Sequence, residues 1–154
     1  MNAFGVNAMP VDLLLNINTP QLVPSNLSIL TTTYLNADSG NNEPVFAEDN
    51  NGLTGVPIEI HLPPDVAQVG DFGELTSWSY NNGWTETGTW SLESSSPGFA
   101  NLVQNARLYD SQNNLISTGK ITSKINEMGE PVHITYYQDL ITDGIVLDFS
   151  ITIN

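Results

Sequence analysis

Residues able to bind a hard metal ion are concentrated in one polar segment, NADSGNNEPVFAEDNNGLTG, which spans residues 36–55. Carboxylate and amide oxygens are the ligands that Ca²⁺ prefers in proteins. Their spacing does not follow the EF-hand pattern, so the alternative is an acidic loop that only faces solvent. A shorter donor cluster runs from Asp110 to Asn114. The calcium candidates are Asp38, Asn42, Glu43, Glu48 and Asp49.

Residues arranged for catalysis are few. A nucleophilic serine needs a base, and the two histidines, His61 and His133, each lie in a strand pattern, which favours exposed strand histidines. The chain has no HExxH motif, no glycine-rich phosphate loop and no dinucleotide fingerprint. Carboxylates are plentiful, but no spacing singles out a catalytic pair. We therefore expect a non-enzymatic protein that requires no cofactor, with calcium as the one candidate ion.

The charge balance of the chain is strongly acidic. Seventeen Asp and Glu residues stand against three basic ones, Arg107, Lys120 and Lys124, for a net charge of −14. Such a surface repels phosphate backbones and anionic lipids, so we expect neither nucleic acid nor membrane surfaces as partners. The polar surface is mostly uncharged, which favours an extracellular or cell-surface protein over an acidic cytoplasmic one.

Other compartment signals are few. The chain has no cysteine, which excludes disulfides and thiolate sites without reporting a compartment. The segment MNAFGVNAMPVDLLLNIN lacks a basic region and an apolar run long enough for a signal peptide or a membrane span, so we expect no membrane insertion. The sequon that starts at Asn26 permits N-glycosylation in an exported protein.

Apolar and polar residues alternate in short runs, which predicts an all-β fold of about nine antiparallel strands. The clearest strand is Val56–Leu62, where we expect Val56, Ile58, Ile60 and Leu62 to face the core while Pro57, Glu59 and His61 face solvent. The other predicted strands are Val11–Asn18, Leu27–Asn36, Glu74–Tyr80, Trp84–Leu92, Ala100–Tyr109, Leu115–Ile125, Pro131–Gln138 and Ile145–Ile153.

Turn signals divide these runs. The segment from Tyr80 to Gly83 and the pair Asp143-Gly144 both contain residues that tolerate positive φ, which predicts two hairpin turns. Residues 36–55 are predicted to be one long polar loop and residues 1–10 a flexible N-terminal segment. No linker composition divides the chain, so residues 1–154 are predicted to form a single domain.

Aromatic residues gather around the first of these hairpins. Alternation puts Trp78 and Tyr80 on one face, and Trp84 and Trp90 also on one face. Core packing is the expected use, with Trp90 as a large anchor, while an exposed aromatic platform for a glycan would have the same sequence pattern.

Several segments in order resemble one family. DLLLNIN, LSILTTTYLN, TGVPIEIHLPPDV, then Gly88-Thr89-Trp90, Pro97-Gly98 and ANLVQNARLYD resemble the immunoglobulin-like conserved repeat domains of bacterial and archaeal cell-surface proteins, including S-layer-associated and adhesin-like ones. The resemblance covers roughly residues 11–109. It implies an immunoglobulin-like β-sandwich at a cell surface. The family usually occurs as tandem modules, and residues 111–154 add strands beyond its pattern.

A second, shorter resemblance points elsewhere. LYDSQNNLISTG and ITYYQDLITDG are similar to segments of small β-barrel cyclases of the allene oxide cyclase-like group, which fold polyenes within a barrel. If that resemblance holds, Glu130, Tyr136 and Tyr137 are the residues to test as lumen groups.

These observations favour a non-enzymatic structural or adhesive surface protein that associates with copies of itself or with neighbouring surface proteins into a filament or array. The strand Val11–Asn18 is expected either to pair in its own sheet or to be donated to a neighbouring copy. A virion decoration or fibre domain is the first alternative, and the barrel cyclase is the second.

Overall fold

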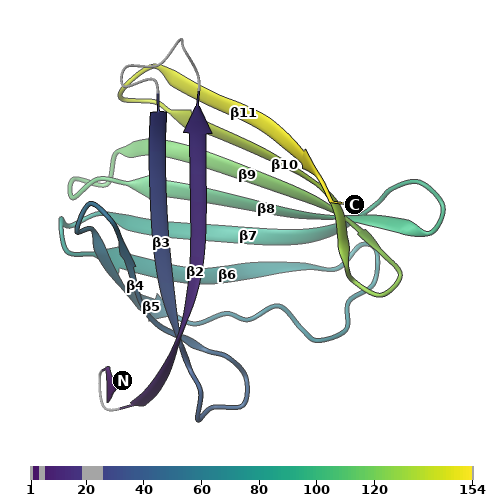
Figure 1. Cartoon of the computed structure of the whole chain (residues 1–154), viewed down its shortest axis with the longest axis horizontal. Coiled ribbons are helices and arrows are strands. Elements are labelled where there is room, and N and C mark those ends of the chain that lie inside the picture. The colour runs from purple at the N-terminus through teal and green to yellow at the C-terminus, as the bar shows by residue number, and fades with distance from the viewer. Residues whose placement is uncertain (1, 4–5, 19–25, 154) are drawn as a thin grey trace. The chain divides into compact units, whose positions relative to one another are not determined.

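The fold is all-β, as the sequence predicts (Figure 1). The computed structural model describes the backbone of residues 2–3, 6–18 and 26–153, and the side chains of residues 7–12 and 30–153. Its strands are β1 (Asn2–Ala3), β2 (Val6–Asn18), β3 (Asn26–Asn36), β4 (Pro44–Asp49), β5 (Thr54–Glu59), β6 (Phe72–Tyr80), β7 (Thr85–Ser94), β8 (Phe99–Tyr109), β9 (Leu115–Asn126), β10 (Pro131–Leu140) and β11 (Ile145–Thr152).

The strands form one open antiparallel sheet in which the hydrogen-bonded order follows the chain from β1 to β11. Eleven strands therefore replace the predicted nine or so. An immunoglobulin-like sandwich also needs pairings between strands distant in sequence, and its arrangement is not confirmed by the described strands. In this part of the chain no helix is long and apolar enough to cross a membrane.

The chain divides into two compact units, whereas the sequence predicted a single domain. Unit 1 comprises Met1–Ile60 and Trp78–Asn82, and unit 2 comprises His61–Ser77 and Gly83–Asn154. The boundary passes through β6, whose last three residues belong to unit 1.

In unit 1, the N-terminal strand pairs within its own chain. The whole of β2 from Ala8 to Asn18 is antiparallel to β3 in register, with Ala8 opposite Asn36 and Asn18 opposite Asn26. Residues 2–3 and 6–10, which the sequence predicted to belong to a flexible segment over residues 1–10, lie in β1 and β2. The side chain of Asn26 lies outside the described residues.

The predicted loop over residues 36–55 contains a strand, β4. It pairs with β3 on one side, where Thr33 lies opposite Ala47, and with β5 on the other, where Ala47 lies opposite Gly55. The sequence did not predict this strand because two of its six residues, Glu48 and Asp49, are acidic. Both carboxylates are hydrogen-bonded inside the unit, which lets them occupy a strand.

The faces of β5 are the reverse of those predicted. A Cβ at Gly55 would lie 2.9 Å from Cε1 of Tyr80 and 3.5 Å from Cε3 of Trp78, so both rings cover the face that Gly55 shares with Pro57 and Glu59. This places Trp78 and Tyr80 on one side, as predicted. Alternation then turns Val56 and Ile58 the other way, and both are exposed, as are Ile60 and Leu62 beyond the end of the strand.

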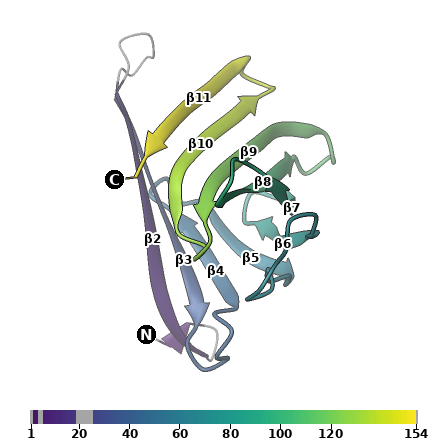
Figure 2. The ribbon, with the colours of Figure 1, turned by 90° about the vertical axis from the view of Figure 1, so that its right-hand side faces the viewer.

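Unit 2 contains most of β6 and a curved meander from β7 to β11 (Figure 2). We call the side that carries Trp90 the pocket face and the other side the cation face. Pairing in register aligns the pocket-face side chains in rows across the strands, and one row runs Trp90, Gln104, Ile121, Tyr136, Phe149. Trp90 is 6% exposed, which confirms it as a core anchor.

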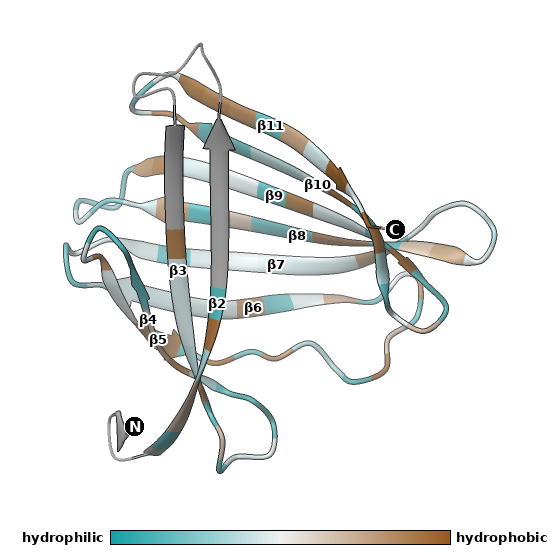
Figure 3. Ribbon diagram, viewed as in Figure 1, coloured by the Kyte–Doolittle hydropathy of each residue, from teal (hydrophilic) through white to brown (hydrophobic). Residues whose placement is uncertain are grey.

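The last strand of this meander is apolar at both ends. Hydrophobic segments occupy much of β11 in Figure 3, and Ile145, Val146 and Ile151 are exposed. In the described sheet, β10 is the one partner of β11. The free side of β11 is therefore an apolar strand edge, a feature that favours pairing with another chain.

Three hairpin turns share one construction, five residues that begin with Asp or Asn. In the β9–β10 turn, Oδ1 of Asn126 accepts hydrogen bonds from N–H of Met128 (3.0 Å) and of Glu130 (2.9 Å), and Gly129 has φ of 80°. Asp49 and Asp110 make the same pair of bonds at β4–β5 and β8–β9. These turns fix the register of the strands that follow them.

Both predicted glycine turns are confirmed. Gly83 (φ 84°) lies in the β6–β7 turn, and Gly144 (φ 63°) lies in the β10–β11 turn, where N–H of Asp143 donates to the Leu140 carbonyl at 3.1 Å. Positive φ values of this size are accessible to glycine without a steric penalty.

The side chain of Asn126 is expected to stabilise unit 2. Asn126→Ala removes an acceptor of two backbone N–H groups, so the free energy of unfolding should fall by about 1–2 kcal/mol. Met128→Ala, in the same turn, is the matched control because that side chain is 78% exposed. Urea unfolding followed by circular dichroism measures both. Equal stability of the two variants would contradict the assigned role of the turn.

Candidate functional site

A cavity of about 320 Å³ opens on the pocket face of unit 2. Its walls combine apolar groups with a few polar ones, a mixture typical of small-molecule sites. The lining residues are Leu75, Glu86, Gln104, Asn105, Ala106, Leu108, Ser117, Gly119, Lys120, Ile121, Tyr136 and Gln138.

Three polar side chains on the cavity wall form a chain of hydrogen bonds. The Tyr136 hydroxyl donates to Oε1 of Gln138 at 2.6 Å, and Nε2 of Gln138 donates to Oγ of Ser117 at 3.3 Å. Ser117 is 4% exposed, so this end of the chain is almost fully withdrawn from water. Because each member is fixed by its neighbour, the wall presents its polar groups in a preset arrangement.

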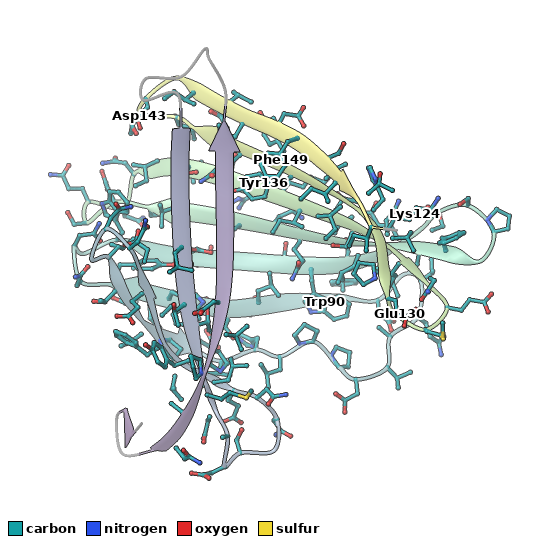
Figure 4. The ribbon with its side chains drawn as sticks, in the orientation of Figure 1. Trp90, Lys124, Glu130, Tyr136, Asp143 and Phe149 are labelled. Atoms are coloured by element: carbon teal, nitrogen blue, oxygen red, sulfur yellow. The ribbon has the colours of Figure 1, made fainter. Side chains whose placement is uncertain are left out.

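Tyr136 is further held by its ring. It stacks on Phe149 with ring centroids 4.9 Å apart and planes 24° apart, and the two side chains lie together on β10 and β11 in Figure 4. Burial raises the pKa of Tyr136 above its ordinary value of 10.0, and the negative charge of Glu86 raises it further. Tyr136 is therefore a neutral hydrogen-bond donor at physiological pH.

The opposite face of the same sheet carries every basic residue of the chain. Arg107 lies opposite Thr118, while Lys120 and Lys124 lie opposite Asn105 and Asn101. All three therefore project from the cation face of β8 and β9. Within the described part of unit 2, no carboxylate lies within ion-pair distance of them, and Lys124 lies over the ring of Phe99 at 4.5 Å.

Unit 1 has no positively charged side chain. It contains six of the seventeen acidic residues and none of the basic ones. The six are Asp12, Asp38, Glu43, Glu48, Asp49 and Glu59. Unit 2 holds the other eleven acidic residues together with the three basic ones. The chain thus has one unit with acidic charges alone and one unit in which a local cationic strip can attract carboxylates.

The structure does not gather the five calcium candidates. Oδ2 of Asp38 accepts a hydrogen bond from N–H of Asn7 at 3.2 Å, and Oε1 of Glu48 accepts one from the Tyr34 hydroxyl at 2.7 Å. Asp49 holds its turn, and Asn42 has φ of 53° in the loop before Glu43. Among the described side chains, no three of their carboxylates converge as metal ligands would.

The second donor cluster, Asp110 to Asn114, is the turn between β8 and β9. Oδ2 of Asp110 accepts a hydrogen bond from Nδ2 of Asn114 at 2.9 Å, in addition to the two backbone bonds of the turn. The bonds from the Asn114 side chain and backbone hold the pKa of Asp110 below its ordinary value of 3.8. These oxygens are already used in shaping the turn.

The remaining candidates are dispersed. His61 lies beyond the end of β5, with Nε2 3.3 Å from Oε2 of Glu74, and Nδ1 of His133 is 3.1 Å from Oγ1 of Thr152. Of the three cyclase candidates, Tyr136 alone lines the cavity, because Glu130 bonds to Asn126 in a turn and Tyr137 faces the other way.

Sequence reasoning missed Glu86, Gln104, Ser117 and Gln138 as lining residues. The signal that could have found them is a row of small residues, Gly88, Ala106 and Gly119, which lie side by side on β7, β8 and β9. That row becomes visible only when the pairing register of the strands is known.

Comparisons of this chain with known proteins identify no related protein. No protein-family model matches this chain, and neither a curated protein nor a solved structure gives a match. The two faces of unit 2 and the charge of unit 1 are therefore the features of the molecule that bear on its function.

The raised pKa of Tyr136 makes stability depend on alkaline pH. The folded state binds the phenol proton more tightly than the unfolded chain, so this stabilisation is present below pH 10.0 and is lost as pH rises through the raised value. The melting temperature of the wild type should fall more steeply above that pH than that of Tyr136→Phe.

Thermal unfolding followed by circular dichroism across this range measures the difference. Tyr137→Phe, which removes a hydroxyl from the opposite face of the same strand, is the matched control. Parallel curves for the wild type and Tyr136→Phe would show that the hydroxyl of Tyr136 is not in the environment described.

Proposed function

We propose that this chain is a non-enzymatic structural or adhesive protein of a cell surface that associates head to tail with copies of itself. The observation that carries the proposal is the placement of Arg107, Lys120 and Lys124 on one face of unit 2, while unit 1 carries acidic residues alone. The partners are copies of this chain, and no cofactor is required.

Local electrostatics support association through this strip. The cation-face positions of β8 and β9 contain no acidic residue, and carboxylates on that face begin on the flanking strands with Glu93 of β7 and Asp139 of β10. An acidic segment of another copy can therefore contact the cations along β8 and β9 with no carboxylate of these two strands between them. Arg107 and Lys120 are exposed and lie on diagonally adjacent positions of paired strands. Single exposed ion pairs stabilise little, whereas several charges that meet together give specificity and orientation.

The segregation of charge also supports an open assembly. The cationic strip lies in unit 2, and the acidic residues that we propose it meets lie in unit 1 of the next copy, so the two contact surfaces of a copy differ. Contacts between different surfaces repeat without closing unless a rotation brings them back, and they generate filaments. The apolar free edge of β11 is a second surface that such contacts would cover.

The surface location rests on composition and on the resemblance to immunoglobulin-like surface repeats. Uncharged polar residues dominate the cation face, where β7 contributes Thr85, Thr87 and Thr89. The sandwich that the resemblance implies would need strand pairings beyond the chain-order pairings described. A virion decoration or fibre domain would use the same head-to-tail contacts.

The second candidate is the small β-barrel cyclase, for which Tyr136 on the cavity wall is the supporting observation. Its other two expected lumen residues, Glu130 and Tyr137, do not line the cavity. A cyclase would convert an added polyene epoxide in a manner that Tyr136→Phe abolishes, and the structural protein would leave the compound unchanged.

Self-association should depend on the cationic strip rather than on net charge. The double variant Arg107→Gln, Lys120→Gln should weaken the association constant at least about tenfold, because several charge contacts are lost together. The pair Gln112→Glu, Met128→Glu is the matched control, since it changes the net charge by the same amount at exposed turn positions. Sedimentation velocity over a concentration series measures both.

Salt provides an independent check on the same preparation. Association should be strongest near 0.15 M salt, since at about 0.01 M the repulsion between copies of charge −14 extends over roughly 30 Å, and at about 1 M the strip itself is screened. Uniform monomers at every salt concentration, or equal weakening by both double variants, would refute association through this strip.

A further inference from the structure

The cavity of unit 2 exists because one row of the pocket face lacks side chains. Gly88 lies opposite Ala106, Ala106 opposite Gly119, and Gly119 opposite Gln138, so three small residues adjoin on β7, β8 and β9. The rows on either side carry large side chains, with Leu108 in one and Ile121 in the other. The missing side chains leave a trough between them.

Backbone geometry does not require glycine at the centre of this trough. A Cβ at Gly119 would meet the Cβ of Ala106 at 3.8 Å and the Tyr137 carbonyl oxygen at 4.0 Å, both ordinary contacts, and its φ is not in the left-handed region. At Gly88 the position is already covered, because a Cβ there would lie 3.1 Å from Cδ1 of Leu75. The open space therefore lies above Gly119 and Ala106.

Among the described side chains of the pocket face, one charged group faces this space. Glu86 lies opposite Leu108, and Leu108 lies opposite Ser117, which places Glu86 in the row beside the trough. Lys120 and Asn105 are also lining residues, but they lie opposite each other on the alternate positions that project to the cation face. The charge that acts on the pocket face is therefore negative, as its influence on Tyr136 also indicates.

We infer that this pocket binds a small organic cation, a primary amine attached to an apolar or aromatic body. The ammonium group would meet the carboxylate of Glu86, and the body would lie in the trough against Leu108 and Ile121. The Tyr136 ring adds an aromatic face, which attracts cations. The volume of about 320 Å³ suits a ligand of this size, at the lower end of small-molecule sites.

The charge expected of the ligand follows from the charge of the pocket. A partly desolvated carboxylate favours a counter-cation strongly and disfavours an anion, and the net charge of −14 concentrates cations around the protein. The hydrogen-bonded chain of Tyr136, Gln138 and Ser117 stays intact on the wall and orients the body of the ligand. This site is independent of the strip that we propose for self-association, because the two lie on opposite faces of the sheet.

Three indole probes of similar shape test the effect of ligand charge. They are tryptamine, a cation, 3-(2-hydroxyethyl)indole, which is neutral, and indole-3-acetate, an anion. Titration of ¹⁵N-labelled full-length protein, followed by ¹H–¹⁵N spectra, should show saturable shifts around Ala106, Gly119 and Gln138. Tryptamine should bind at least about tenfold more tightly than the neutral probe, and the anion more weakly than either. Glu86→Gln should remove the preference for tryptamine over the neutral probe.

Gly119→Val should fill the trough and abolish binding of all three probes, while the melting temperature stays equal to or above that of the wild type. Thr118→Val, which faces the other side of the same strand, is the matched control and should bind like the wild type. Equal affinity for the three probes, tightest binding of the anion, or unchanged binding by Gly119→Val would overturn the inference.

Discussion

Antiparallel pairing between chain neighbours is the constraint on which the rest of the molecule depends. The strands from β2 to β11 pair in chain order, and three turns built on Asp49, Asp110 and Asn126 use the same side-chain hydrogen bonds. Because side chains alternate along a strand, a slip of one residue would exchange the two faces. The pocket and the cationic strip exist as separate surfaces only while this register is kept.

The charged side chains of unit 2 are also distributed between its two faces. A chain with seventeen acidic residues and three basic ones would be expected to surround each cation with carboxylates. Instead, the three cations lie on two adjacent strands, β8 and β9. The other cation-face positions of these strands carry uncharged residues, such as Asn101, Asn105, Thr118 and Thr122. Carboxylates on this face begin only on the flanking strands, with Glu93 of β7 and Asp139 of β10, so the cations can orient an acidic partner along β8 and β9. The opposite face keeps one carboxylate, Glu86, beside an apolar trough.

Local sequence patterns predicted the strand segments well, because alternation and positive-φ turn residues are local signals. They failed where nonlocal contacts decide. β4 looked like a loop because the bonds that satisfy Glu48 and Asp49 come from Tyr34 and from the turn. The faces of β5 were exchanged because the rings of Trp78 and Tyr80 cover Gly55. The small-residue trough was invisible, since its three members are distant in sequence and meet only through register.

The most direct test of head-to-tail association joins the two proposed surfaces chemically. An equal mixture of ¹⁴N- and ¹⁵N-labelled protein is treated near 0.15 M salt with a zero-length carboxyl–amine cross-linker, and linked peptides are identified by mass spectrometry. The account predicts mixed-isotope links from Lys120 and Lys124 to acidic residues of unit 1, such as Asp38, Glu43 and Glu59. Links confined to peptides of a single isotope would show that the cationic strip does not meet a second copy.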